Sequence, residues 1–344
     1  MLVLSACGGG GGQAKGGAGE TITIKLATPT AGSHHWSKNA LLPWQKLVEE
    51  KTNGRVKVQL YEGGTLGTFN SVLTDLQGGL YDVGMVVPSY FMNSKMYPLS
   101  ILTLAFAYPD PATGGKIGAE FFQKNADKVK IDGVRNLGVA VSDSYVFFST
   151  KPIKTLTDIK GMKIRAQGAA DAEIVKAWGG VPVNVPVQES YEALQKGVVE
   201  VSPYSSVGAL GLKIHEVAPY LLDTKAWGTV TVPAMSEKFH ASLPDDLKKV
   251  FDQELGPKLA ELMQQSYIKE EDAARQQLPE LLKKNGGDWL SVSSADLAQF
   301  KAGSQSQWDV WIKDANSKGY DGQGLVRSYL ELMSAAGAEP PVKG

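Results

Sequence analysis

Two short segments near the start of the chain alternate apolar and polar residues, namely TITIKLA (residues 21–27) and RVKVQLY (residues 55–61). A period of two is typical of half-buried β-strands. Between these segments, Leu41, Trp44 and Val48 recur at the spacing of one helix face, and a glycine follows at the expected stop. Strand, helix, strand is the repeating unit of a parallel sheet, so the pattern predicts an α/β fold.

The same order of elements returns in the second half of the chain. It predicts a strand over residues 139–150, the strand GMKIRA, a helix over 171–178, a strand over 181–186, a helix over 188–197 and a strand over 198–202. Two such units in series predict two domains with a cleft between them. The helical pattern of residues 245–284 predicts a long helix lying across both.

Charge is balanced along the chain, with 35 basic and 36 acidic residues and a net charge of -1. This balance gives no positive surface for phosphate backbones or anionic membranes, so we expect no nucleic-acid partner. No later segment approaches the roughly 18 consecutive apolar residues of a membrane-spanning helix.

Cys7 is the only cysteine, which excludes intrachain disulfides and cysteine metal clusters. It ends the tetrapeptide LSAC, which resembles the lipobox of bacterial lipoproteins, and residues 8–20 are typical of a flexible tether. We therefore expect the remnant of a lipoprotein signal peptide in residues 1–20, lipidation of Cys7, and a monomer outside the cytoplasmic membrane. Only three residues precede LSAC, so the recorded start is expected to be truncated or misassigned; an incidental cysteine is the alternative.

Catalytic motifs were sought without success: the chain has no GxSxG, Walker, GxGxxG or HExxH sequence. The four histidines are His34, His35, His215 and His240, and only the first two adjoin. Their spacing does not predict a metal site. We expect a protein that is not an enzyme, with no cofactor and no bound metal.

Arg165 ends the strand in DIKGMKIRAQG, where open α/β sheets bind their ligands. An arginine there is more often solvated or paired with a surface carboxylate, and position alone favours that alternative. Several aromatic residues also lie near strand ends and predict an organic ligand with apolar surface, although core packing remains an alternative for each. They are Trp36, Tyr90, Phe91, Tyr145, Phe147 and Tyr204.

Four segments in order resemble the periplasmic solute-binding proteins of tripartite ATP-independent periplasmic (TRAP) transporters, the DctP-like family, over residues 21–336. They are VKVQLYEGGTLG, KPIKTLTDIKGMKIRAQG, GGVPVNVPVQESYEALQKGVVE and SEKFHASLPDDLKKVF. The resemblance implies two α/β domains, joined by crossing strands and a long helix, that close over a small organic acid. We expect domain I to comprise residues 21–147 with about 228–262, and domain II residues 148–227 with about 263–340.

By this resemblance, Arg165 binds the ligand carboxylate, because a planar guanidinium matches a carboxylate in a bidentate pair. Glu189 matches a family glutamate at the cleft or hinge. The other residues implied as ligand contacts are His35, Trp36, Ser89, Tyr90, Tyr145, Phe147, Gln167 and Tyr204.

Residues 200–205 depart from the family pattern. They read EVSPYS where dicarboxylate-binding members often read DGQENP, so Tyr204 replaces a ligand asparagine. Pro203 stands where keto-acid-binding members have a metal-binding glutamate. We therefore expect a monocarboxylate with an apolar or aromatic body, delivered to a TRAP membrane permease. The alternatives are a binding protein of an ATP-driven transporter, a chemoreceptor, or a periplasmic enzyme.

Overall fold

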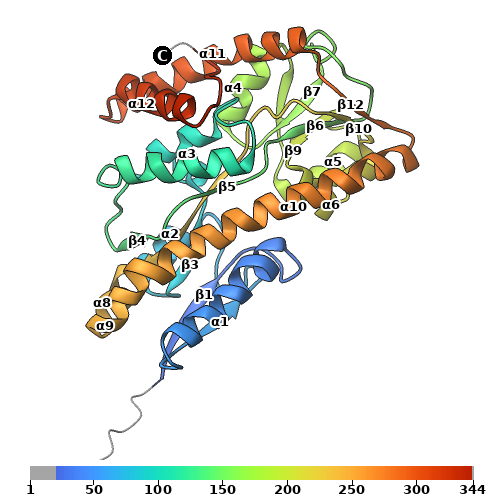
Figure 1. The fold of residues 1–344 in the computed structure, drawn as a ribbon. Helices are drawn as coiled ribbons and strands as arrows, with labels where there is room; N and C mark the ends of the chain where they lie inside the picture. The colour runs from blue at the N-terminus through green and yellow to red at the C-terminus, as the bar shows by residue number, and fades with distance from the viewer. Residues whose placement is uncertain (1–20, 343–344) are drawn as a thin grey trace, which may run out of the picture.

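The computed structural model describes residues 21–342 as two β-sheets with helices around them (Figure 1). The first sheet has the strand order β2-β1-β3-β11-β4, and β5 pairs with β11. Strands β1, β2 and β3 are parallel, whereas β11 runs antiparallel to its neighbours. Its strands are β1 (Ile22–Ala27), β2 (Val56–Tyr61), β3 (Val83–Val86), β4 (Val134–Asn136), β5 (Ala140–Val141) and β11 (Val230–Ser236).

The second sheet has the strand order β12-β10-β6-β9-β7-β8. Strand β7 is parallel to both β8 and β9, and β6 is antiparallel to β9 and β10. Its strands are β6 (Val146–Ser149), β7 (Lys163–Ala166), β8 (Val181–Asn184), β9 (Val201–Tyr204), β10 (Tyr220–Leu222) and β12 (Asp288–Leu290). The two-sheet α/β architecture predicted from the sequence is confirmed.

Helices cover both sheets (Figure 1). The α-helices are α1 (Leu42–Lys51), α2 (Val72–Gly78), α3 (Pro111–Lys124), α4 (Ala169–Ala177), α5 (Ser190–Gln195), α6 (Ser206–Gly211), α7 (Ile214–Val217), α8 (Glu237–Ser242), α9 (Asp245–Val250), α10 (Gly256–Lys284), α11 (Ser294–Ser317) and α12 (Gly322–Ala335). The 3-10 and π segments are η1 (Ser37–Leu41), η2 (Pro88–Tyr90), η3 (Tyr97–Thr103), η4 (Val187–Glu189) and η5 (Phe251–Leu255). In the described range of residues 21–342, no helix combines the length and apolar character that a bilayer crossing requires.

The first predicted unit, strand, helix and strand, folds as expected. Ile22 pairs with Val56 at the start of the parallel β1–β2 ladder. Trp44 of α1 is fully buried, and its indole N–H donates to the carbonyl of Leu255 at 2.7 Å. The apolar face of α1 therefore packs between the first sheet and the long helix.

Three chain connections join the two sheets. The first runs from β5 to β6 through residues 142–145, and the second runs from β10 to β11 through residues 223–229. The third is the continuous helix of residues 245–284, formed by α9, η5 and α10, which crosses the molecule diagonally in Figure 1. This confirms the long helix. The strand predicted over residues 139–150 is interrupted because the chain changes sheets there.

The C-terminal helix lies with the first sheet, although the sequence assigns residues up to about 340 to domain II. Tyr329 of α12 is fully buried and meets the ring of Phe121 from α3 edge to face, with centroids 5.4 Å apart. An amphipathic pattern predicts that one face of α12 is buried, but it does not predict the domain against which that face packs. Cys7 and the expected tether lie outside the described residues.

Candidate functional site

Arg165 lies in β7, between β8 and β9 of the second sheet. Because β7 and β9 are parallel, their carboxyl ends lie at the same edge, and Tyr204 is the last residue of β9. Strand β6 is antiparallel to β9, and the pair Val146–Tyr204 places Tyr145 at that edge too. The topology thus brings three predicted site residues together.

The Arg165 side chain is almost completely buried, with 2% of its surface exposed. Its Nε–H donates to the carbonyl of Val185 at 3.1 Å, and its guanidinium carbon lies 5.4 Å from the ring centre of Tyr204. Its Nη2 atom is buried and has no hydrogen-bond partner among residues 21–342. The alternative that Arg165 is a solvated arginine on the surface is therefore wrong.

Tyrosine rings surround this guanidinium. Tyr145 and Tyr204 are stacked, with ring centroids 6.1 Å apart and planes 9° from parallel. Burial raises the pKa of Tyr204 to about 12 and that of Tyr145 well above its usual value, while the positive charge of Arg165 opposes both shifts. Both rings are therefore neutral at physiological pH and present hydroxyl groups and aromatic faces.

Tyr90 approaches from the first sheet, in η2 directly after β3. It is 44% exposed and stacks on Phe69, with centroids 5.9 Å apart and planes 4° from parallel. Burial raises the pKa of Tyr90, and the positive charge of Arg165 opposes this shift. Tyr90 therefore lies within electrostatic range of Arg165, although the two residues belong to different domains. Ser89, its neighbour, is exposed.

Trp36 and His35 are buried next to this aromatic group. Trp36 meets Phe69 and Tyr267 edge to face at 6.4 and 6.1 Å. His35 Nδ1 lies 2.7 Å from the hydroxyl of Ser266 on α10. Burial lowers the pKa of His35 to about 3, helped by His34, and burial lowers the pKa of His34 to about 4. Both imidazoles are therefore neutral at physiological pH.

The sequence analysis did not single out Asp171. It lies in the first turn of α4, and its carboxylate accepts a hydrogen bond from the backbone N–H of Gln167 at 3.0 Å. Burial raises the pKa of Asp171, while that hydrogen bond and the charge of Arg165 oppose the shift. The side chain of Gln167 is exposed. Asp171 thus lies within electrostatic range of the buried guanidinium without forming an ion pair with it.

Phe147 and Glu189 lie apart from this group. Phe147 is fully buried in the core of the second sheet, against Trp178, Trp227 and Phe300, because it lies two residues further into β6 than Tyr145, away from the edge of the sheet. Glu189 is exposed in η4. Trp227, which the sequence did not indicate, packs against Tyr145 at 6.2 Å.

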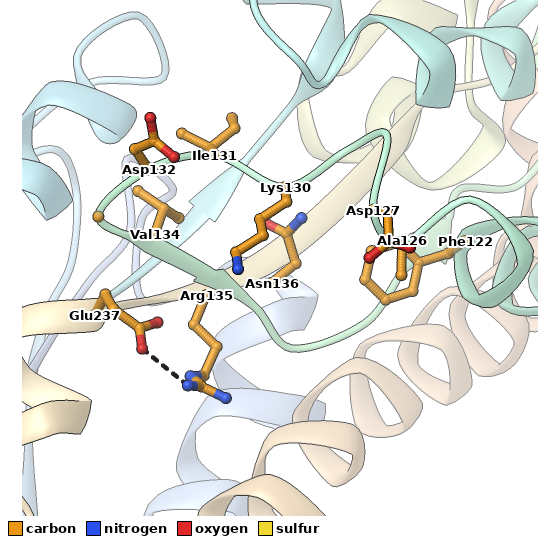
Figure 2. Close-up of a pocket in the computed structure, with 11 residues that line it drawn as sticks. Phe122, Ala126, Asp127, Lys130, Ile131, Asp132, Val134, Arg135, Asn136 and Glu237 are labelled. Atoms are coloured by element: carbon orange, nitrogen blue, oxygen red, sulfur yellow. Dashed lines mark hydrogen bonds and ion pairs between the residues drawn. The ribbon is translucent and has the colours of Figure 1, made fainter.

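A separate surface pocket of about 500 Å³ lies on the first domain (Figure 2). Its arginine, Arg135, is already paired with Glu237 at 2.8 Å and with Asp252 at 3.1 Å. Although the Nε of Arg135 is buried without a hydrogen-bond partner among the described residues, both terminal nitrogens are already paired with carboxylates, whereas Arg165 forms no ion pair within residues 21–342.

Comparison with known proteins places this chain in a family and gives one relative of similar sequence. Residues 27–314 match the model of the bacterial extracellular solute-binding proteins, family 7 (DctP). A solute-binding protein of Sulfitobacter sp. strain NAS-14.1 is 29% identical over 241 residues, which is 67% of this chain and 72% of that protein.

Two solved structures share the fold. A TRAP periplasmic solute-binding protein from Desulfovibrio salexigens is 25% identical, with a TM-score of 0.81, over 93% of this chain and 98% of that one. A marine metagenome TRAP solute-binding protein specific for aromatic acid ligands, in complex with 3-hydroxybenzoate, is 24% identical. Its TM-score is 0.82, over 92% of this chain and 99% of that chain.

The buried histidines predict sensitivity to acid. The unfolded chain binds a proton at His35 near pH 6.5 and the folded protein only near pH 3, so this contribution to stability is complete above pH 6.5 and is lost as the pH falls. From pH 7 to pH 5, protonation of His35 in the unfolded chain should lower the free energy of unfolding by about 2 kcal/mol. In His35→Gln, this contribution of His35 should be absent when the free energy of unfolding is measured in urea at the two pH values.

Lys38→Gln, an exposed change nearby, serves as the control and should retain the wild-type dependence. An identical pH dependence in His35→Gln and in the wild type would show that His35 is protonated in the folded protein.

Proposed function

This chain belongs to the family 7 bacterial extracellular solute-binding proteins, and from that membership we propose that it is the receptor of a TRAP transporter for a monocarboxylate with an apolar or aromatic body. It is a periplasmic binding protein and not an enzyme. The carboxylate of the ligand binds Arg165, and a membrane permease receives the ligand.

The single observation that carries this proposal is the state of Arg165. A guanidinium removed from water is costly unless it is paired, yet Nη2 is buried without a partner among the described residues. Since Nε already donates to Val185, the two terminal nitrogens are left for an anion. A carboxylate matches them in a planar, bidentate pair.

The aromatic residues support a ligand with an apolar body. Tyr145 and Tyr204 form a stacked pair beside the guanidinium, and Tyr90 faces it from the other domain. Aromatic rings prefer stacked or edge-to-face contacts with flat apolar groups. Their hydroxyls also offer hydrogen bonds to a polar substituent on such a ligand.

Asp171 supports a single carboxylate rather than two. Arg165 is the cation that neutralises the first carboxylate, and Asp171 adds a negative charge beside it. A second carboxylate on a short ligand would be repelled by Asp171, and like charges in a site that is largely dry disfavour each other strongly.

The comparisons support the ligand class and the transporter type. The marine metagenome protein of the same fold binds 3-hydroxybenzoate, which is an aromatic monocarboxylate. That protein and the Desulfovibrio salexigens protein are both TRAP receptors, which favours this transporter over an ATP-driven one or a chemoreceptor.

The proposal includes lipid at Cys7. The tetrapeptide LSAC and the glycine-rich residues after it are the features that support it. Acyl chains on the cysteine would hold the receptor at a membrane surface, and residues 8–20 would let it move toward the permease.

Arg165→Ala should weaken binding of benzoate or 3-hydroxybenzoate at least tenfold, because a charge-assisted pair contributes about 1.5 to 3 kcal/mol. Arg165→Lys should recover part of the affinity, since lysine offers a point charge without the planar pair. Isothermal titration calorimetry gives both constants. Arg55→Ala removes an exposed arginine paired with Asp246 and should bind as the wild type does. Equal affinity in Arg165→Ala would refute the assignment.

Asp171→Asn should relax the discrimination against dicarboxylates, because it removes the negative charge beside Arg165 and keeps the size of the side chain. We expect succinate affinity to rise about tenfold and benzoate affinity to change less than threefold. Glu173→Gln, two residues along α4, is the matched control. Tight succinate binding by the wild type would contradict the proposed ligand class.

Cys7→Ser should move the protein from the membrane fraction to the soluble periplasmic fraction when it is expressed behind a complete lipoprotein signal peptide. The serine hydroxyl cannot receive the thioether-linked lipid, so the anchor is lost. Metabolic labelling with a radioactive fatty acid measures the modification directly. Label on the Cys7→Ser variant, or none on the wild type, would argue against lipidation at this position.

A further inference from the structure

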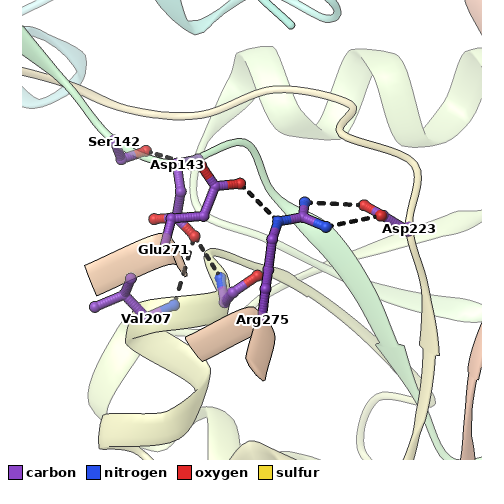
Figure 3. A network of polar contacts seen from close by, with 7 residues as sticks. Ser142, Asp143, Val207, Asp223, Glu271 and Arg275 are labelled. Atoms are coloured by element: carbon purple, nitrogen blue, oxygen red, sulfur yellow. Dashed lines mark hydrogen bonds and ion pairs between the residues drawn. The ribbon is translucent and has the colours of Figure 1, made fainter. Parts of the chain in front are cut away.

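A network of charged side chains lies where the three connections between the sheets meet (Figure 3). Arg275 of α10 pairs with both oxygens of Asp223, at 2.9 and 3.2 Å, and its Nε–H donates to Glu271 at 2.8 Å. Asp223 belongs to the second connection, directly after β10. Asp143 belongs to the first connection, and its carboxylate lies close enough to Glu271 to feel its charge.

Asp143 also contacts the ligand site. Its Oδ2 accepts hydrogen bonds from the backbone N–H of Ser206 at 2.7 Å and of Val207 at 3.5 Å. These residues begin α6, two positions after Tyr204. Asp143 also precedes Tyr145 by two residues. The carboxyl group of Asp143 thus accepts hydrogen bonds from the segment that follows Tyr204, while Asp143 itself belongs to the segment that contains Tyr145.

The surroundings of this carboxyl group are unusual. The side chain is fully buried, and its second oxygen, Oδ1, has no hydrogen-bond partner among the described residues. An ionised carboxylate in this position loses its hydration and faces the negative charge of Glu271. The nearest cation, Arg275, is already shared between Glu271 and Asp223.

We propose that Asp143 is a positioning residue that holds α6 and the Tyr204 segment against the interdomain connections, and that its ionisation lowers the affinity of the site for anions as the pH rises through neutrality. This inference rests on the proposed function, because it concerns the regulation of the same anion site.

The titration supports this assignment. Burial raises the pKa of Asp143 to about 7, the charge of Glu271 adds to the shift, and the hydrogen bonds from Ser206 and Val207 oppose it. Tyr108 and Tyr267 also face Asp143, but burial raises the pKa of each, so both stay neutral near pH 7.

The direction of the effect follows from charge. When Asp143 is protonated, the region between the domains carries one negative charge fewer, and an anionic ligand is bound more tightly. Because this coupling is reciprocal, a bound anion must raise the pKa of Asp143, and the free energy of that shift equals the loss of anion binding that ionisation of Asp143 causes. The histidines next to the site, His34 and His35, are already neutral above pH 5 and do not contribute in this range.

The first experiment needs no ligand. Carbon-13 NMR of the side-chain carboxyl of Asp143 should show a midpoint near pH 7 in the wild type. In Asp143→Ala, amide hydrogen exchange at Ser206 and Val207 should be at least tenfold faster, and Asp143→Asn, whose amide oxygen is still an acceptor, should recover part of the protection. Unchanged exchange in Asp143→Ala would overturn the positioning role, and a midpoint below pH 5 would overturn the regulatory role.

The second experiment measures the dissociation constant of benzoate, which stays ionised, between pH 5.5 and pH 8.5. The wild-type constant should rise about three- to tenfold with pH, and Asp143→Asn should be nearly independent of pH. Asp321→Asn changes another helix-capping aspartate, which accepts from Gly324 on α12, and should behave as the wild type. If wild-type and Asp143→Asn constants share one pH dependence, the regulatory role is refuted.

The two experiments separate this inference from the proposed function. If neither benzoate nor 3-hydroxybenzoate binds at any pH, the proposed ligand class fails. The amide exchange then still decides whether Asp143 positions α6, and the NMR midpoint still decides whether it titrates near neutrality. If benzoate binds tightly at every pH to both proteins, the proposed function stands and the regulatory role of Asp143 fails.

Discussion

A buried guanidinium that is only partly satisfied by the protein is the constraint on which the rest of the site depends. Arg165 is nearly dry, and removing such a charge from water is expensive unless partners replace the lost hydration. The carbonyl of Val185 and the face of Tyr204 supply part of that replacement. The remaining donors lie in one plane because the guanidinium is itself planar, and burial in the sheet holds that plane in place before any ligand arrives.

The placement of the neighbours follows from the way the chain passes between two sheets. The residues of the three connections can transmit a change in one domain to the other. Besides apolar side chains such as Trp227, these connections carry the charged residues Asp143, Asp223, Glu271 and Arg275. Hydrogen bonds and ion pairs are directional, so the network restricts the relative orientation of the connections more narrowly than apolar packing would. Because the network is buried in a region of low dielectric, a change in its protonation state alters the electrostatic interactions of the site strongly.

Much of the candidate site could be predicted from local sequence. Strand periodicity places Arg165, Tyr145 and Tyr204 near strand ends, where open α/β sheets bind ligands, and the family resemblance adds the role of Arg165 in binding a carboxylate. Phe147 has the same local signal, yet it is a core residue, because it lies two residues further from the sheet edge than Tyr145, where Trp178, Trp227 and Phe300 cover its ring. Asp171 and Trp227 had no sequence signal, since an aspartate early in a helix and a tryptophan in a connection have many ordinary structural roles.

The sequence by itself determined the two α/β units, the long helix and the arginine at a strand end, because these depend on periodicity and on residue types within a few positions of each other. Only the tertiary structure decided that Tyr90 faces Arg165, that α12 packs on the first domain, and that Asp143 meets the start of α6. These contacts join residues that are 63 to 208 positions apart in the chain. A local pattern states how deeply a side chain is buried, but the partner it meets is set by chain topology and by how the sheets twist and stack.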